Sequence, residues 1–487
     1  MNKSALKKFA IDARNDLRDK VKTKAFQYGI TEESIKNKNI VSSKDFFRDG
    51  KYALTRIEKE QRDKVKNLME AKGFNQVVEE VAYTWFNRFT ALRFMEIHSY
   101  LPSKVRVLSS INEGSVEPDI IREALNIDLD VDKETIYNLK MSNENDAVNK
   151  LYKYLILAQC DALSGVLPFL FGKTDDYTKL LFPDGLLTEG SFVRKMTDTS
   201  ELPESDWEKV EVIGWLYQYY IAEKKDEVFK DLKKNIKISK ENVPAATQLF
   251  TPHWIVRYMV ENSLGRIWVE SYPDTALKSD WKYYLEEAEQ EDEVKKQLEK
   301  IRYKNVNPEE ITFLDPCCGS GHILVYAFEV FYAMYLEKGY VESEIPKLIL
   351  EKNLFGLDID DRAAQLAAFA VMMKAREKSR RVSRQEVKLN ICAIQESNWL
   401  SEQGFSGLKD SQDLLVDKRA TEIEKRQQRT TVEYLAEVFR DAREYGSILD
   451  SDSLVSNLPV IFEKSSPFTL NKSSMLSCDV TIIQTLP

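Results

Sequence analysis

The strongest constraint on the fold comes from residues 311–394, where short apolar runs alternate with long ones. The runs "ITFLDP", "LFGLDID" and "EVKLNICAI" have the length and composition of buried strands. Between them, "HILVYAFEVFYAMYLEKG" and "DRAAQLAAFAVMMKAREK" have the length of helices. This alternation is typical of a parallel sheet with right-handed crossovers, so the sequence predicts an α/β fold for residues of about 245–400.

The first strand is joined to its helix by "DPCCGSG", residues 315–321. Ligands of such sheets bind outside the carboxyl ends of the strands, where this turn lies. Gly319 and Gly321 lack Cβ atoms and would let a ligand approach the main chain. Asp315, at the strand end, can accept hydrogen bonds from a cationic or hydroxyl-bearing ligand. The turn is therefore a candidate binding site.

The dinucleotide fingerprint does not fit this turn. A third glycine would be needed at position 324, which is Leu324, and Asp358 closes the second strand much further on than the roughly 20 residues of that fingerprint. A ligand with an adenosine ribose and an amino-acid end fits better, because Asp358 can bind ribose hydroxyls while Asp315 and the glycine turn hold the amino-acid end. S-adenosylmethionine is such a ligand.

The chain of 487 residues exceeds one ordinary core, so we expect at least two domains. Residues 1–240 are predicted to be mostly helical, and a stripe at steps of three and four marks one long helix: Val77, Val81, Trp85, Phe89 and Leu92. Residues 241–450 hold the α/β pattern. Residues 451–487 are Ser-rich and have no sustained period, which predicts an irregular tail.

Charge, cysteine content and hydropathy argue against several classes of protein and of binding site. A net charge of −9 rules out a uniformly basic nucleic-acid binder, although two local basic stretches remain. The basic residues of the first two dozen positions form either a solvated helix face or a phosphate-contacting one, and residues 374–388 form either a solvated loop or a DNA-backbone contact. Five scattered cysteines and three histidines predict a reducing, cytoplasmic setting and no metal site. No apolar run approaches the roughly 20 residues of a membrane span.

Upstream of the sheet, the stretch "QLFTPHWIV" predicts a helix start. Thr251 suits the N-cap and Pro252 the first helical position, with the helix running to about Trp268. Because helix N-termini attract anions, a ligand carboxylate could bind there.

Three of these strings resemble motifs of amino-methylating DNA methyltransferases. "LDPCCGSG" is similar to their D-P-x-C-G-S-G motif, "FGLDID" to the acidic motif that follows it, and "QLFTP" to the F-T-P element that precedes both in the adenine-specific group. All three occur in the order of that group. The resemblance implies S-adenosylmethionine as cofactor, bound by Phe250, Thr251, Pro252, Asp315, Pro316, Gly319, Gly321 and Asp358.

The N-terminal half narrows the resemblance. "AYTWFNRFTALRFMEIH" and "GWLYQYYIAEKKDEVF" look like the PglX methyltransferases of bacteriophage-exclusion (BREX) systems. That family implies a site-specific adenine methyltransferase acting on double-stranded DNA, with other phage-defence proteins as possible partners. It also implies a helical N-terminal domain followed by a partial doubly wound, Rossmann-like methyltransferase domain.

The sequence departs from the family at the target amine. The family holds it with an Asn-Pro-Pro-Tyr motif, and the nearest string here is "SNLPV", with Asn457 and Pro459. Gln395 or Glu396 could face the adenine ring, and no catalytic residue is assigned. We therefore expect a C-terminally truncated chain. Two alternatives stay open: an inactive cofactor-binding or docking protein, and the modification subunit of a multi-subunit restriction system.

Overall fold

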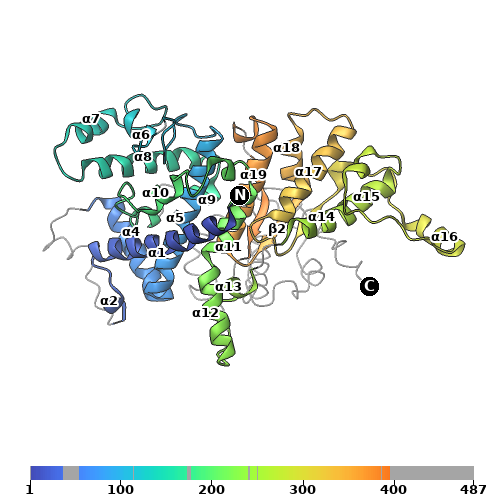
Figure 1. Cartoon of the computed structure of the whole chain (residues 1–487), viewed down its shortest axis with the longest axis horizontal. Helices are drawn as coiled ribbons and strands as arrows, with labels where there is room; N and C mark the ends of the chain where they lie inside the picture. The colour runs from blue at the N-terminus through green and yellow to red at the C-terminus, as the bar shows by residue number, and fades with distance from the viewer. Residues whose placement is uncertain are drawn as a thin grey trace, which may run out of the picture. The chain divides into compact units, whose positions relative to one another are not determined.

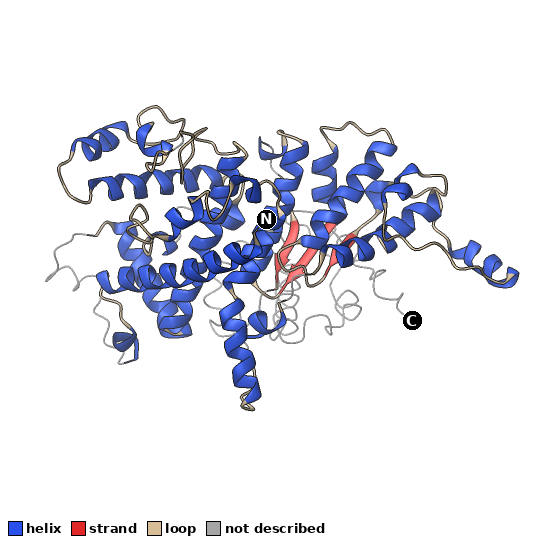
Figure 2. Cartoon of the chain, viewed as in Figure 1, coloured by secondary structure: helices blue, strands red, loops and turns tan. Residues whose placement is uncertain are grey.

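The computed structural model describes residues 2–36, 54–112, 114–172, 177–239, 242–248, 251–384 and 387–394. These residues divide into two compact units (Figure 1). The N-terminal unit comprises the described residues up to 238, with 245–248 and 383–384, and the sheet unit comprises the others. The described strands all belong to the sheet unit (Figure 2).

The regular secondary structure in the described part of the N-terminal unit is all helical. It contains α1 (Lys3–Gln27), α2 (Glu32–Lys36), α4 (Arg56–Lys72), α5 (Phe74–Ile97), α6 (Asp119–Arg122), α7 (Lys133–Met141), α8 (Ala147–Ser164), α9 (Pro168–Phe171), α10 (Phe192–Thr197), α11 (Glu211–Tyr220) and α12 (Ala222–Lys233), with 3-10 turns at Tyr177–Lys179 and Glu204–Trp207. After α12, α13 (Val243–Thr247) leads toward the sheet unit.

Helix α5 forms the centre of the N-terminal unit. Its predicted stripe is fully buried, from Val77 through Trp85 to Leu92. Burial extends beyond one stripe, because almost every side chain from Val77 to Glu96 is inaccessible. The sequence had indicated a one-sided amphipathic helix, whereas the neighbouring helices α1, α4 and α9 cover further faces of α5.

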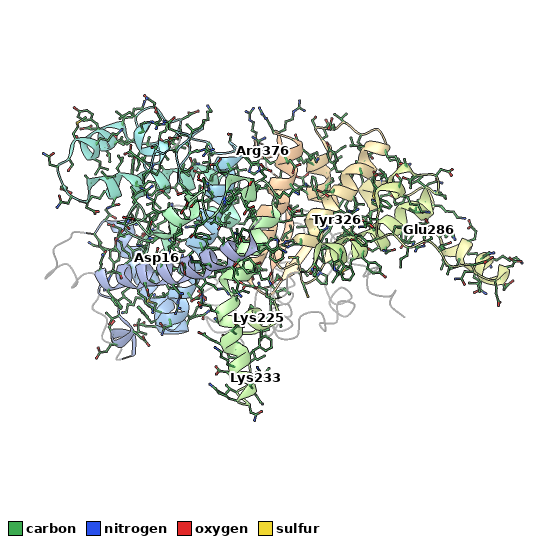
Figure 3. All side chains as sticks on the ribbon, in the orientation of Figure 1. Asp16, Lys225, Lys233, Glu286, Tyr326 and Arg376 are labelled. Atoms are coloured by element: carbon green, nitrogen blue, oxygen red, sulfur yellow. The ribbon has the colours of Figure 1, made fainter. Side chains whose placement is uncertain are left out.

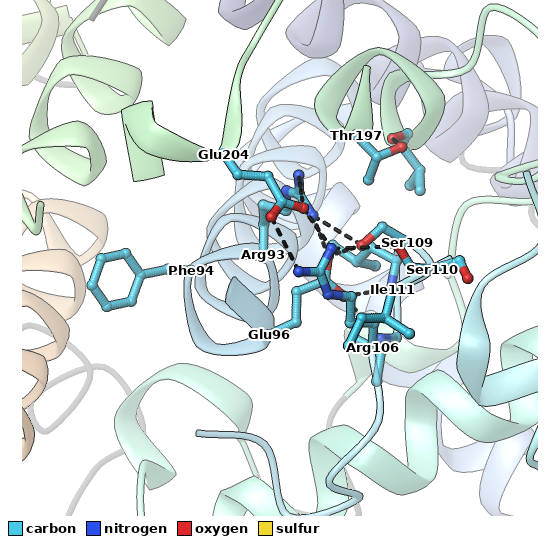
Figure 4. Close-up of polar contacts among 12 residues, drawn as sticks. Arg93, Phe94, Glu96, Arg106, Ser109, Ser110, Ile111, Thr197 and Glu204 are labelled. Atoms are coloured by element: carbon cyan, nitrogen blue, oxygen red, sulfur yellow. Dashed lines mark hydrogen bonds and ion pairs between the residues drawn. The ribbon is translucent and has the colours of Figure 1, made fainter. Parts of the chain in front are cut away.

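The charges that α5 buries are compensated by a polar cluster inside the same unit (Figure 4). Arg93 donates to Glu96 Oε1 at 2.6 Å and to Ser109 Oγ at 3.0 Å. Glu96 Oε2 accepts from two successive backbone N–H groups, each at 2.8 Å. Arg106 pairs with Glu204 beside them. Both oxygens of Glu96 accept hydrogen bonds, and such bonds offset part of the cost of burying an ion pair.

The basic residues of α1 are largely engaged within the N-terminal unit. Arg14 is buried and donates to both carboxylate oxygens of Glu79, at 2.8 and 3.2 Å, while Arg18 lies 2.9 Å from the same carboxylate. Lys24 pairs with Asp184 at 2.6 Å. Both sequence interpretations, a solvated face and a phosphate-contacting face, are therefore wrong for Arg14.

The sheet unit contains three parallel strands in chain order: β1 (Phe313–Asp315), β2 (Leu354–Asp358) and β3 (Asn390–Ala393). Asp315 is in register with Gly356, and Asp358 with Ala393. The predicted parallel α/β sheet is confirmed. The strand β3 is less buried than its apolar sequence had indicated, with Cys392 exposed.

Helices make up the rest of the regular structure described in the sheet unit. They are α14 (His253–Asn262), α15 (Leu264–Ser271), α16 (Asp292–Ile301), α17 (His322–Glu337), α18 (Ile345–Leu348) and α19 (Asp361–Lys378), with a π-helical turn at Ile349–Asn353 and 3-10 turns at Ala276–Asp280, Pro308–Glu310 and Val382–Arg384. Right-handed crossovers between strands in chain order place α17 and α19 on one face of the sheet, and these two helices pack together.

The single helix expected to run from Thr251 to about Trp268 is divided in two. The backbone of Ser263 departs from the helix, with ψ −79°, between α14 and α15. Its hydroxyl donates to the Met259 carbonyl at 2.7 Å, a local bond that competes with helix continuation. Periodicity alone could not show this break.

Candidate functional site

Asp315 ends β1 with its side chain almost wholly buried, at 7% exposure. Its Oδ1 accepts from the Cys317 N–H at 3.2 Å. Its Oδ2 is inaccessible and has no hydrogen-bond partner within the described part of the chain. Burial, with a further contribution from the charge of Asp358, raises the pKa of Asp315 to about 6. A buried carboxylate oxygen without a partner is costly, and a cationic or hydroxyl ligand would satisfy it.

The glycine turn is fastened to the end of β2. The Cys318 N–H donates to the Leu357 carbonyl at 2.8 Å, and the Gly319 N–H donates to Asp358 Oδ2 at 2.8 Å. Pro316, which is exposed and lacks an N–H, follows the last residue of β1 and helps to end that strand. The sequence-predicted residues Asp315, Gly319 and Asp358 thus come together at the carboxyl ends of two neighbouring strands.

The two glycines of the turn differ in what surrounds them. Both have positive φ, 52° at Gly319 and 85° at Gly321. A Cβ at Gly319 would meet nothing within 4 Å, so the main chain there is open to a ligand. A Cβ at Gly321 would lie 2.9 Å from the Cα of Ala367. Gly321 therefore allows α17 to pack closely on α19, which is a structural requirement in its own right.

Asp358 holds the turn as well as facing the site. Its Oδ2 accepts from Gly319, and its Oδ1 accepts from the Asp360 N–H at 2.8 Å. Burial raises the pKa of Asp358 above its ordinary value. Since each carboxylate oxygen can accept more than one hydrogen bond, hydroxyl donors of a ligand could still be accommodated.

The start of α17 follows directly on the glycine turn. Gly321 occupies the N-cap position and no side chain caps this helix. Ser320 Oγ lies 3.1 Å from His322 Nδ1. Burial, together with the charge of His253, lowers the pKa of His322 to about 4, so the imidazole is neutral near pH 7. The sequence reasoning had not singled out Ser320 or His322, although both lie in or directly after the quoted motif.

The F-T-P element is described in part. Pro252 is the N-cap of α14 and His253 its first residue, so the predicted capping by Thr251 is wrong by one position. The physical reason is that Pro252 has extended backbone, with ψ 141°, and no side-chain hydrogen bond caps the helix. Phe250 lies outside the described residues, as do Gln395, Glu396, Asn457 and Pro459.

The cysteines beside the site are poorly suited to thiolate chemistry. Burial raises the pKa of Cys317 and of Cys318, and the carboxylates of Asp315 and Asp358 raise both further. Both thiols are therefore protonated near neutral pH. Among the described residues, no group of three or more His, Cys, Asp or Glu side chains could hold a metal ion.

The basic stretch 374–388 does not adjoin this site. It begins in the last turns of α19 and ends just before β3, whereas Asp315 and Asp358 lie at the carboxyl ends of their strands. Lys374 is 13 residues beyond Asp361, the first residue of α19, which corresponds to about 20 Å at 1.5 Å per residue. Lys374 is engaged with Glu329 at 2.6 Å. Lys374 is therefore not part of a solvated loop.

Comparison with known proteins bears on the family. No family model matches the chain. Over 402 residues the chain is 45% identical to the adenine-specific methyltransferase BrxX of Escherichia coli O9:H4 (strain HS). The matched region makes up 82% of this chain and 33% of that protein. The chain is therefore a relative of the adenine-specific methyltransferases. It is also 40% identical over 440 residues to the adenine-specific methyltransferase PglX of Lacticaseibacillus casei (strain Zhang), covering 84% of this chain and 35% of that one.

These matches confirm the PglX resemblance carried by the three motifs and the aromatic helices. The chain spans about a third of the length of both curated relatives. Among the residues that the structure describes, no helix combines the length and the apolar character needed to cross a bilayer.

Proposed function

We propose that the sheet unit binds S-adenosylmethionine at the glycine turn. The observation that carries the proposal is the buried Asp315 Oδ2, which has no hydrogen-bond partner among the described residues and lies on the turn opened by Gly319. The α-ammonium group of the cofactor would supply the missing donor. Its carboxylate would face the start of α17, which no side chain caps and where the helix dipole favours an anion.

In this proposal the other motif residues bind or cover the remaining groups of the cofactor. Asp358 would bind the ribose hydroxyls while keeping its bond to Gly319. Phe250, Thr251 and Pro252 would close over the cofactor, as the F-T-P resemblance implies, with Pro316 and Gly321 shaping the turn beneath it. We assign this site to a methyltransferase domain of about residues 241–450, after a helical domain of residues 1–240.

We further propose that the domain is a doubly wound, Rossmann-like sheet. In such sheets the strand order reverses beside the first strand. The described order β1-β2-β3 places β1 at one end, which is where strands on the far side of a reversal would pair.

For the whole protein we propose site-specific transfer of a methyl group to the exocyclic amine of adenine in double-stranded DNA, in BREX-type phage defence within the cytoplasm. S-adenosylmethionine supplies an electrophilic methyl group for that reaction. The amine is a weak nucleophile inside the duplex, so the base must be flipped out and positioned before transfer.

A second candidate is a cofactor-binding protein without transfer activity. The absence of an Asn-Pro-Pro-Tyr string from all 487 residues favours it. Incubating the purified chain with tritiated S-adenosylmethionine and phage DNA separates the two. Tritium in N6-methyladenine supports the transferase, and saturable binding without transfer supports the second candidate. Absence of binding would refute the proposed site itself.

A further inference from the structure

Three residues of α14 converge on one tyrosine of α17. His253, Arg257 and Glu261 are spaced four residues apart, so they lie along one face of α14. All three contact Tyr326, which is labelled in Figure 3. The His253 and Tyr326 rings lie 6.2 Å apart, the Arg257 guanidinium lies 5.4 Å from the centre of the Tyr326 ring, and the Tyr326 hydroxyl donates to Glu261 Oε1 at 2.7 Å.

Glu261 is held in place by hydrogen bonds to both of its carboxylate oxygens. It is fully buried, yet both oxygens are satisfied. Arg257 Nε donates to Oε1 at 2.8 Å, and the backbone N–H of Tyr283 donates to Oε2 at 2.6 Å. Burial and the neighbouring Glu261 raise the pKa of Tyr326, which keeps its hydroxyl protonated as a donor. Hydrogen bonds to a buried charge are strong and geometrically demanding.

The contact links α14 along its length, from His253 in its first turn to Glu261 in its last, to a tyrosine near the start of α17. Tyr326 is four residues beyond His322, the first residue of α17, and so lies one turn from the glycine turn. His253 is the first residue of α14, directly after Pro252. The side chain of Tyr326 therefore ties the residue that follows the F-T-P element to the helix that begins at the glycine turn.

We propose that Tyr326 is a positioning residue that holds Thr251 and Pro252 in register with the glycine turn, and that through this register it sets the affinity for S-adenosylmethionine without touching the cofactor. The inference rests on the proposed function. Its physical basis is that a small displacement of one half of a preorganised site loses binding even when every contact residue is present.

The test compares two substitutions of the same kind on the same helix. Tyr326→Phe removes the hydroxyl that reaches Glu261 and keeps the ring. Tyr335→Phe is the matched control, because Tyr335 is fully buried near the other end of α17 and donates to Asn353 Oδ1 at 2.9 Å. Binding of S-adenosylmethionine to the full chain is measured by calorimetry, and the unfolding temperature is measured for each variant.

We expect Tyr326→Phe to weaken cofactor binding about tenfold, because loss of the hydrogen bond to Glu261 lets α14 shift relative to the glycine turn, and a small misplacement of a preorganised site is costly. Tyr335→Phe should leave the dissociation constant unchanged while lowering the unfolding temperature at least as much. Equal dissociation constants for both variants would overturn the inference. If Tyr326→Phe fails to fold, His253→Ala is the deciding variant, because His253 is exposed and contacts the same ring. Unchanged cofactor binding by His253→Ala would also overturn the inference.

The outcomes separate this inference from the proposed function. If the unmodified chain does not bind S-adenosylmethionine, the proposed function fails. If the unmodified chain binds and Tyr326→Phe binds equally well, only the positioning role is lost.

Discussion

Replacing Asp315 with Asn should weaken cofactor binding and stabilise the free protein at the same time. The loss of binding follows from Oδ2, the buried oxygen that has no partner among the described residues. A charge-assisted hydrogen bond to an ammonium group contributes about 1.5–3 kcal/mol, which corresponds to roughly 10- to 150-fold in the dissociation constant. Asn is uncharged and presents an N–H donor where the ligand also donates.

The gain in stability follows from the pKa of Asp315. Burial raises that pKa from the ordinary 3.8 to about 6, so ionisation is harder in the folded than in the unfolded chain. The resulting loss of folding stability is absent below pH 3.8, the ordinary pKa of the unfolded chain. It grows as the pH rises toward 6 and is complete above pH 6. About two pH units at 1.36 kcal/mol each amount to about 3 kcal/mol. Part of this gain is lost because the Asn amide is itself left without an acceptor. We therefore expect Asp315→Asn to raise the free energy of unfolding by about 1–3 kcal/mol.

The assay is urea unfolding at pH 7.5 combined with calorimetric titration of S-adenosylmethionine. Asp12→Asn serves as the matched control, because Asp12 pairs with Lys195 on the surface of the N-terminal unit. Cofactor binding by the unmodified chain should also weaken as pH falls through about 6, and Asp315→Asn should lose that dependence. A variant that is less stable than the unmodified chain, or that binds equally well, would refute the reasoning.

Three further predictions concern the turn and the N-terminal unit. Gly319→Ala should lower cofactor affinity and cost only about 1–2 kcal/mol of stability for its left-handed backbone. Gly321→Ala should lower the unfolding temperature further, because its Cβ would clash with α19. Equal unfolding temperatures for the two variants would contradict this difference in packing. Asp358→Ala should weaken cofactor binding by about 1–3 kcal/mol, and unchanged calorimetric affinity would remove Asp358 from the site. Glu96→Ala should destabilise the N-terminal unit by about 3–5 kcal/mol, because the buried Arg93 loses its 2.6 Å partner and keeps only Glu204, at 3.7 Å, as a charged neighbour; a change below 1 kcal/mol in urea unfolding would contradict that.

The sheet was predictable from the sequence because its signals are local. The alternation of strand and helix runs, the glycines and the strand-end Asp315 all lie within a short stretch, and parallel pairing follows from the crossover lengths. The break at Ser263 was not predictable, since a hydroxyl that bonds to a carbonyl one turn back leaves no trace in the apolar period. The burial of Arg14 was also hidden, because its partner Glu79 lies on another helix.

The proximity of three candidate residues was predictable from the sequence, but their contacts within the fold were not. Motif spacing brought Asp315, Gly319 and Asp358 together correctly, yet only the structure shows that Asp358 also bonds to the turn and that Gly321 makes room for α19. The contact of α14 with Tyr326 depends on residues more than 60 positions apart. Reading such a contact requires knowing which helix faces meet.

The central claim is tested most directly by a crystal structure of the chain with S-adenosylmethionine. The account predicts the α-ammonium nitrogen about 3 Å from Asp315 Oδ2, the carboxylate at the start of α17, and the ribose hydroxyls at Asp358. Cofactor bound elsewhere, or Asp315 Oδ2 still without a donor in the complex, would contradict it.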